Sequence, residues 1–126
     1  MELKDIKKGD ILTTKYFRGS NGPNLRDYIV FIANGYYEKN LAYENEYCIH
    51  AIAMVNLAGK LVFSFGNDIK SVGYQQEDKF HPYHIYSTLR KATLTETLEL
   101  MEKLKAHGII YDRKKQELKL IRELKK

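Results

Sequence analysis

The sequence predicts an α+β fold: a small bent antiparallel sheet or SH3-like β-barrel, followed by one amphipathic helix and a short C-terminal basic hairpin. Three observations lead to this prediction. Apolar residues alternate along several short segments between residues 11 and 90, and turn residues separate these segments. One stretch after residue 92 has apolar residues at helical spacing. The positive charge is concentrated near the C-terminal end.

Length and composition indicate one globular domain. The chain has 126 residues, which we expect to divide into a sheet part over 1–90 and a helix with a basic hairpin over 91–126. Cys48 is the single cysteine, so no intrachain disulfide can form, which fits a reducing cytoplasm. No apolar run approaches the ~20 residues of a membrane span. The N-terminus has no apolar signal region, so we expect a cytoplasmic protein without membrane contact.

Turn residues precede the first expected strand. Gly9-Asp10 marks a turn before the alternating segment 11–17, which predicts a strand. This opening, from Lys7 to Leu12, is similar to the first strand of many small SH3-like barrels. The following stretch, 18–24, is rich in Gly, Ser, Asn and Pro and indicates a connecting loop. No Gly-Lys-Ser/Thr follows it, which excludes a phosphate-binding P-loop.

Two further segments predict the middle of the sheet. Residues 27–37 form a strongly apolar strand with a bulge or turn at Asn34-Gly35. Residues 46–65 predict a hairpin around a turn at 56–59, and this hairpin should be the centre of the core. Its first strand is apolar on both faces, as a central strand is. One face is expected to hold Tyr47, Ile49, Ala51, Ala53 and Val55.

The second half of the chain predicts two more strands, a helix and a hairpin. A short edge strand is expected at 69–76 and a final strand after Tyr83. Thr93 and Glu96 form a capping box, and Gly108 ends the helix. The helix should dock on the sheet through one apolar stripe, Leu94, Leu98, Met101 and Leu104. After it, residues 109–111 and 118–121 predict a hairpin around 112–115, with a short helical ending from Gln116 as the alternative.

The segment from Ala92 to Ile121 also resembles a known group of proteins. It holds Ala-Thr, an acidic amphipathic helix, a glycine, an aromatic-Asp pair, two lysines and Glu-Leu, at Ala92, Thr93, Glu96, Leu104, Gly108, Tyr111, Asp112, Lys114, Lys115, Glu117 and Leu118. This order resembles the C-terminal unit of small proteins from Bacteroides-type bacteria and their phages or mobile elements. That group usually has Tyr and Trp where this chain has Ile109 and Tyr111. The resemblance covers about a quarter of the chain, implies a phage-related or mobile-element accessory protein, and implies no catalytic residue.

Aromatic content favours a binding function over an enzymatic one. The chain has ten tyrosines, a residue type that is enriched at protein interfaces. Several aromatic residues are expected near loops, where they are available for contact: Tyr16, Phe17, Tyr36, Tyr37, Tyr43, Tyr74, Tyr83 and Tyr86. We therefore expect a non-enzymatic binding or assembly protein that contacts another protein and needs no cofactor. A homo-oligomer is an open alternative.

The basic tail supports nucleic-acid binding as the first alternative function. Residues 103–126 hold nine Lys or Arg against three acidic residues, a net charge of +6, whereas residues 1–102 carry twelve against thirteen, a net of −1. Such a tail attracts nucleic acid or an acidic partner, or simply keeps the protein soluble. The candidate phosphate contacts are Lys114, Lys115, Lys119, Arg122, Lys125 and Lys126.

A metal-dependent enzyme is the second alternative. Cys48 and His50 share one face of the expected central strand, and His81 and His84 lie close together in sequence, so the four provide thiolate and imidazole ligands. No Cys-x-x-Cys or His-Glu-x-x-His spacing accompanies them. A lone cysteine on a central strand is usually a small core residue, and we expect Cys48 to be buried and unreactive. The same position favours a hydrogen-bonded core histidine at His50.

Overall fold

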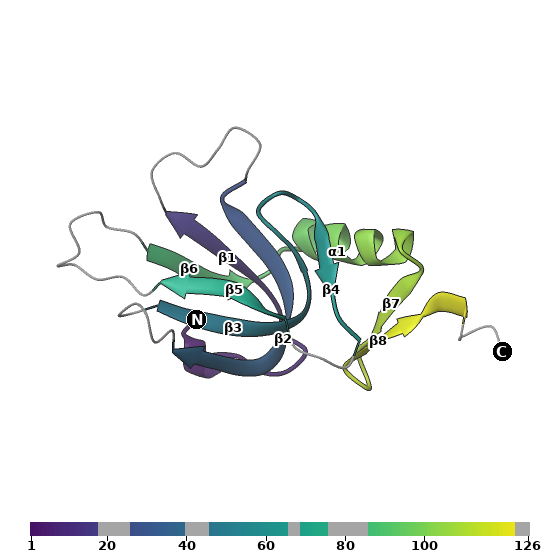
Figure 1. The fold of residues 1–126 in the computed structure, drawn as a ribbon, viewed down its shortest axis with the longest axis horizontal. Coiled ribbons are helices and arrows are strands. Elements are labelled where there is room, and N and C mark those ends of the chain that lie inside the picture. Colours follow the sequence, from purple (N-terminus) through teal and green to yellow (C-terminus); the bar gives the residue numbers. More distant parts are fainter. Residues whose placement is uncertain (18–25, 40–45, 66–68, 76–85, 123–126) are drawn as a thin grey trace.

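The computed structural model describes residues 1–17, 26–39, 46–65, 69–75 and 86–122 (Figure 1). In this part of the chain a bent antiparallel sheet of six strands is accompanied by one α-helix, one 3-10 helix and a two-stranded hairpin, which confirms the α+β class. The elements are η1 (Leu3–Asp5), β1 (Ile11–Phe17), β2 (Tyr28–Lys39), β3 (Glu46–Val55), β4 (Leu61–Phe63), β5 (Ile69–Gln75), β6 (Tyr86–Lys91), α1 (Leu94–Ala106), β7 (Ile109–Asp112) and β8 (Glu117–Leu120). None of the described helices is long and apolar enough to cross a membrane.

β3 is an interior strand with neighbours on both sides, as its two apolar faces predicted. The strand order is β4-β3-β2-β1-β6, and β5 also pairs with β3. β5 pairs with the first half of β3 and β4 with the second half, so both edges of β3 are bonded. The turn between β3 and β4 is the predicted one: Gly59 has φ +74°, and the Asn56 side chain accepts the amides of Ala58 and Lys60.

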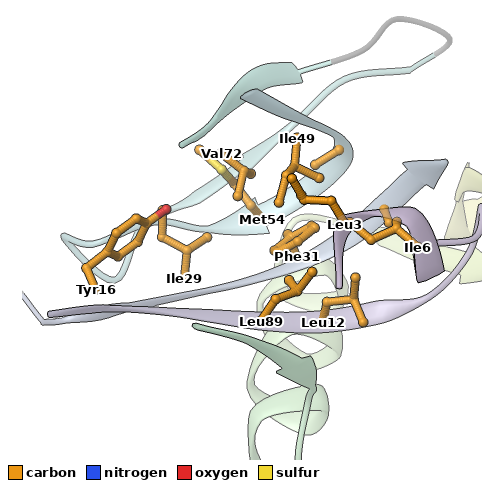
Figure 2. Close-up of a cluster of buried hydrophobic side chains, with 12 residues drawn as sticks. Leu3, Ile6, Leu12, Tyr16, Ile29, Phe31, Ile49, Met54, Val72 and Leu89 are labelled. Atoms are coloured by element: carbon orange, nitrogen blue, oxygen red, sulfur yellow. The ribbon is translucent and has the colours of Figure 1, made fainter. Parts of the chain in front are cut away.

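Two apolar clusters lie on opposite faces of the sheet. The inner cluster is shown in Figure 2 and consists of Leu3, Ile6, Leu12, Tyr16, Ile29, Phe31, Ala33, Ile49, Ala51, Met54, Val72 and Leu89. The outer cluster lies beneath α1 and the β7–β8 hairpin and consists of Val30, Ile32, Ala53, Val55, Leu100, Leu104, Ile109 and Leu118. Because side chains alternate along a strand, β2 contributes to both clusters. Burial on both faces explains why this strand is apolar at every position from Ile29 to Ala33.

Two irregularities bend the β2–β3 pair. Ile32 pairs with Ala53 but the next residue, Ala33, pairs with Ala51, so β3 has one extra residue at this point. An extra residue reverses which face the following side chains occupy. Ala53 and Val55 therefore belong to the outer cluster, whereas Ala51 belongs to the inner one. The prediction that all five alternate residues of β3 share one face was wrong for this reason.

The second irregularity is the predicted bulge at Asn34-Gly35. The pairing moves from Ala33 opposite Ala51 to Tyr37 opposite Ile49, which leaves unmatched residues on β2. Gly35 has φ +88°, and a Cβ there would lie 3.1 Å from the backbone nitrogen of Lys8. Only glycine meets both the conformation and the close approach without strain.

The sheet bends strongly but does not close. β5 and β6 lie side by side (Figure 1), and the Tyr16 hydroxyl on β1 donates to the Gly73 carbonyl on β5. No ladder joins β5 to β6 within the described residues, so both strands remain edges of an open sheet. The expected SH3-like barrel is therefore not confirmed.

The helix begins and ends as predicted but turns a different face to the sheet. Thr93 and Glu96 form the capping box, Gly108 follows the helix with φ +75°, and the β7–β8 hairpin forms in place of a helical ending. Leu100 and Leu104 are fully buried, whereas Leu94 and Leu98 are 74% and 48% exposed. At 3.6 residues per turn, these two lie roughly 120° and 160° around the helix from Leu100. The prediction that Leu94 and Leu98 dock on the sheet was therefore wrong.

We expect Leu100→Ala to lower the free energy of unfolding by about 2–5 kcal/mol, because it leaves a cavity in the outer cluster. The matched substitution Leu98→Ala, on the same helix, should cost less than about 1 kcal/mol because the side chain is half exposed. Urea unfolding of both variants measures the difference. Equal losses would show that Leu98 is buried in solution.

Candidate functional site

The Glu96 carboxylate fixes the start of α1 against the sheet. Its Oε1 accepts the Thr93 amide at 2.8 Å and the Thr13 hydroxyl of β1 at 3.0 Å. Arg90 of β6 donates from Nη1 to Oε1 at 2.7 Å and from Nη2 to Oε2 at 2.9 Å. The Arg90 guanidinium is the main reason that the pKa of Glu96 falls from 4.5 to about 2, and the Thr93 and Thr13 donors lower this pKa further. The capping residue Glu96 thus also attaches α1 to β1 and β6, and we call this set of contacts the Glu96 clamp.

Arg26 makes a second attachment one turn along the helix. Its Nη1 lies 2.7 Å from Glu99 Oε1, and both side chains are largely buried. The same guanidinium donates to the Val55 carbonyl at 3.2 Å and to the Tyr28 carbonyl at 3.1 Å, and it lies 4.1 Å from the centre of the Tyr28 ring. A planar group with this many partners holds one orientation. The two attachments therefore determine how far α1 is rotated.

This rotation leaves two leucines exposed among polar residues on the side of α1 that is not buried against the sheet. We call it the α1 flank and define it by its exposed residues Leu94, Thr95, Leu98 and Glu102. Leu94 and Leu98 are one turn apart, and Leu98 also borders a hollow that runs along α1 from Thr95 to Ala106. Large exposed apolar side chains that are grouped mark interaction surfaces more often than scattered ones do.

A groove lies next to the first turn of α1. We call it the Lys91–Arg113 groove; it has a volume of about 400 Å³ and is lined by Gly9, Asp10, Ile11, Lys91, Ala92, Leu94, Thr97 and Arg113. Its lining comes from the turn before β1, the ends of β1 and β6, α1 and the tip of the β7–β8 hairpin. Leu94 belongs to both the α1 flank and the groove, so the two form one continuous surface.

Hydrogen bonds to backbone carbonyls hold the parts of this groove together. The Gly9 amide donates to the Ala33 carbonyl at 2.9 Å, and Gln116 Nε2 donates to the Lys8 carbonyl at 2.8 Å. The Gln116 contact ties the hairpin tip to the N-terminal turn. A Cβ at Gly9 would lie 2.8 Å from Gln116 Nε2, and Gly9 has φ +92°, so this position also requires glycine.

The basic tail divides into paired and exposed cations. Lys119 Nζ lies 2.9 Å from Asp112 Oδ2, and this contact is the main reason that the pKa of Asp112 is lowered to about 2. Lys114 and Lys115 are exposed in the hairpin turn, where their amides donate to Asp112. Arg122 is exposed, while Lys125 and Lys126 lie outside the described residues. Arg113, which we did not single out from the sequence, is exposed beside them in the same turn.

Cys48 and His50 differ in their burial on β3. They lie on the face of β3 opposite Ile49, and Cys48 is half-buried rather than a core residue. Burial, with Glu46 and Glu38 adding to it, raises the pKa of the Cys48 thiol, which disfavours the nucleophilic thiolate. His50 is buried, and its Nε2 lies 3.2 Å from Glu38 Oε1, so it is hydrogen-bonded as expected.

The four-ligand metal hypothesis gains no support from the described residues. In that part of the chain no three or more His, Cys, Asp or Glu side chains are grouped so that they could hold a metal ion. His81 and His84 lie outside it.

The aromatic residues expected near loops have different environments. Tyr16 is buried in the inner cluster, and Tyr74 is half-buried. Tyr36 and Tyr37 are exposed on β2, with ring centres 6.2 Å from His50 and 6.0 Å from Tyr47 respectively. The remaining expected positions, Phe17, Tyr43, Tyr83 and Tyr86, have no described side chain.

The Glu96 clamp predicts a specific pH dependence. The pKa in the folded protein, about 2, is below its ordinary value of 4.5, so this carboxylate stabilises the fold above about pH 4.5 and the contribution is lost as pH falls toward 2. We expect Glu96→Gln to lower the free energy of unfolding at pH 7 by about 1–3 kcal/mol, since it removes charged hydrogen bonds. The variant should also lose less stability than the parent between pH 4.5 and 2.

Urea unfolding at several pH values measures both effects. Glu102→Gln, on the exposed side of the same helix, is the matched control and should follow the parent protein. Parallel pH profiles for Glu96→Gln and the parent would contradict the clamp.

Comparisons with known proteins identified no relative of this chain. No protein-family model, no curated protein and no solved structure matches the chain. The surfaces of the chain that bear on its function are therefore the α1 flank, the Lys91–Arg113 groove and the tip of the β7–β8 hairpin.

Proposed function

We propose that this protein is a non-enzymatic binding or assembly protein that acts by contact with another protein through the α1 flank. The supporting observation is the pair Leu94 and Leu98, which the fold leaves exposed one helical turn apart. Fully burying an exposed leucine contributes roughly 1.5–3 kcal/mol, so covering this pair favours association. Apolar residues at this spacing are what a helix presents to a groove in a partner.

The resemblance of the C-terminal segment supports an accessory role in a phage or mobile element. The resembling residues, 92–121, include α1 and the β7–β8 hairpin, which present Leu94, Leu98 and the basic tip. Within this proposal, the bent sheet is an open form of the SH3-like barrel and serves as the scaffold for α1. A bacterial cytoplasmic location fits a chain whose only cysteine, Cys48, has no disulfide partner.

Site-specific photocrosslinking tests this proposal. A photoreactive amino acid replaces Leu98 in one variant and Lys39, exposed at the far end of β2, in a control variant. In lysate of a Bacteroides-type host, we expect a protein adduct from position 98 but not from position 39. The adduct should survive nuclease treatment and disappear when Leu94→Glu is added, because a charge at that position opposes burial.

Two results would overturn the proposal. One is the absence of any adduct specific to position 98, and the other is an adduct that nuclease removes. The second result would favour the nucleic-acid function described next.

Exposed cations at the hairpin tip support nucleic-acid binding as a second candidate function. Arg113, Lys114 and Lys115 are consecutive and exposed, so phosphates can reach them without displacing protein contacts. Lys119 is different because its ammonium group already pairs with Asp112. The tip, rather than the whole tail, is the surface that we propose for phosphate contacts.

We expect Lys114→Gln with Lys115→Gln to reduce the dependence of log K on log salt by up to about 0.7–0.9 per lysine, because each phosphate contact releases condensed counterions. Lys119→Gln is the control and should leave this slope almost unchanged. Fluorescence anisotropy with a labelled oligonucleotide at several salt concentrations measures the slopes. No binding of the parent at about 50 mM salt would exclude the nucleic-acid function.

A further inference from the structure

We propose that the Lys91–Arg113 groove binds an acidic, leucine-containing linear segment of the partner protein. In this arrangement the segment's carboxylates contact Lys91 and Arg113, and its leucine packs against Leu94. The inference rests on the proposed function and deepens it by naming the chemistry of the partner.

The cations of the groove are available for a ligand. Neither Lys91 nor Arg113 has an ion-pair partner among the described residues, and both are exposed. Neighbouring cations differ: Arg90 is held by Glu96 at 2.7 Å and Lys119 by Asp112 at 2.9 Å. A guanidinium binds a carboxylate through two parallel hydrogen bonds, so Arg113 favours an acidic side chain as its ligand.

Apolar lining distinguishes this groove from a simple anion site. Ile11 and Ala92 are partly buried beside the outer cluster, and Leu94 is the most exposed of the large apolar side chains that the structure describes. A ligand that carries only charge would leave this apolar surface in water. A segment in which acidic residues alternate with leucine covers the apolar lining and neutralises the cations together.

The lining also argues against a phosphate backbone as the occupant. Asp10 brings a carboxylate to the same groove, where its Oδ2 accepts the Lys7 amide at 2.9 Å. A repeating chain of phosphates would meet this negative charge, whereas a peptide can place a neutral residue beside it.

The volume of the groove and the hydrogen bonds that join its walls suit a short peptide segment as the ligand. Its volume of about 400 Å³ is open and accommodates a few side chains rather than a folded domain. Its walls are joined by hydrogen bonds, including Ala92 amide to Ile11 carbonyl at 3.0 Å and Gln116 Nε2 to Lys8 carbonyl at 2.8 Å. A groove fixed in this way loses little conformational entropy when a ligand binds.

Fluorescence anisotropy on the full chain tests the inference. The probe is a fluorescein-labelled decapeptide with an Asp-Glu-Leu-Leu-Asp-Glu core. We expect measurable binding that weakens with salt and falls by at least about tenfold in Lys91→Glu with Arg113→Glu. Leu94→Ala should weaken binding by about threefold or more, because it removes apolar contact area.

Matched controls separate the groove from general charge attraction. Lys39→Glu with Lys60→Glu makes the same change in net charge at exposed positions outside the groove, and it should change affinity by less than about twofold. A peptide with Asn and Gln in place of the acids, and one with Ala in place of leucine, should each bind more weakly. If the charge-reversed variant unfolds, Lys91→Gln and Arg113→Gln tested singly give the same comparison.

Four outcomes would overturn the inference. Absence of peptide binding is one, even if position 98 still crosslinks to a protein; the proposed function would then stand with a different partner chemistry. Equal affinity of the groove variant and the control variant is the second. The third is stronger displacement of the probe by an oligonucleotide than by unlabelled acidic peptide. Self-association of the chain that Arg113→Glu abolishes is the fourth, because it would identify the occupant as a second copy.

Discussion

The orientation of α1 depends on the carboxylate of Glu96. One side chain accepts hydrogen bonds from the helix cap at Thr93, from β1 at Thr13 and from β6 at Arg90. The buried Thr13 hydroxyl would lack a partner without it, and the cost of such a group makes the arrangement specific. Together with the Arg26–Glu99 pair, it sets which side of the helix meets the sheet. The exposure of Leu94 and Leu98 follows from that rotation, and so does the surface on which the proposed function depends.

The sheet provides the rigid base for this arrangement because its two middle strands are buried on both faces. β2 alternates between the inner and outer clusters along its apolar half. The extra residue in β3 reverses the faces of its side chains partway along the strand. Ile49 and Ala51, before it, therefore pack in the inner cluster, whereas Ala53 and Val55, after it, pack in the outer cluster. Close packing on both sides leaves few alternative registers for these strands. The helix and hairpin are therefore attached to the part of the molecule that is hardest to deform.

Ion pairing separates structural cations from those available for binding. Arg26, Arg90 and Lys119 each lie within 3 Å of a carboxylate oxygen. Lys91, Arg113 and the two lysines of the hairpin turn have no such partner within the described part of the chain and face solvent around the groove and the hairpin tip. Net charge alone does not show this division. Within the basic tail this distinction applies to Lys119, whose ammonium group is already paired with Asp112.

The sequence by itself determined the features that depend on neighbours in the chain. The positions of the strands, the turn at Asn56–Gly59, the capping box, the glycine after α1 and the final hairpin are local signals, and the structure confirms each of them. Tertiary structure decided the face of α1 that is buried, because Leu94, Leu98, Leu100 and Leu104 surround too much of the helix for spacing to choose between them. It also decided which face of the sheet the side chains of β3 occupy after the extra residue, and it brought Lys91 and Arg113 together at one groove. These features depend on contacts between residues far apart in the chain, and no local pattern records such contacts.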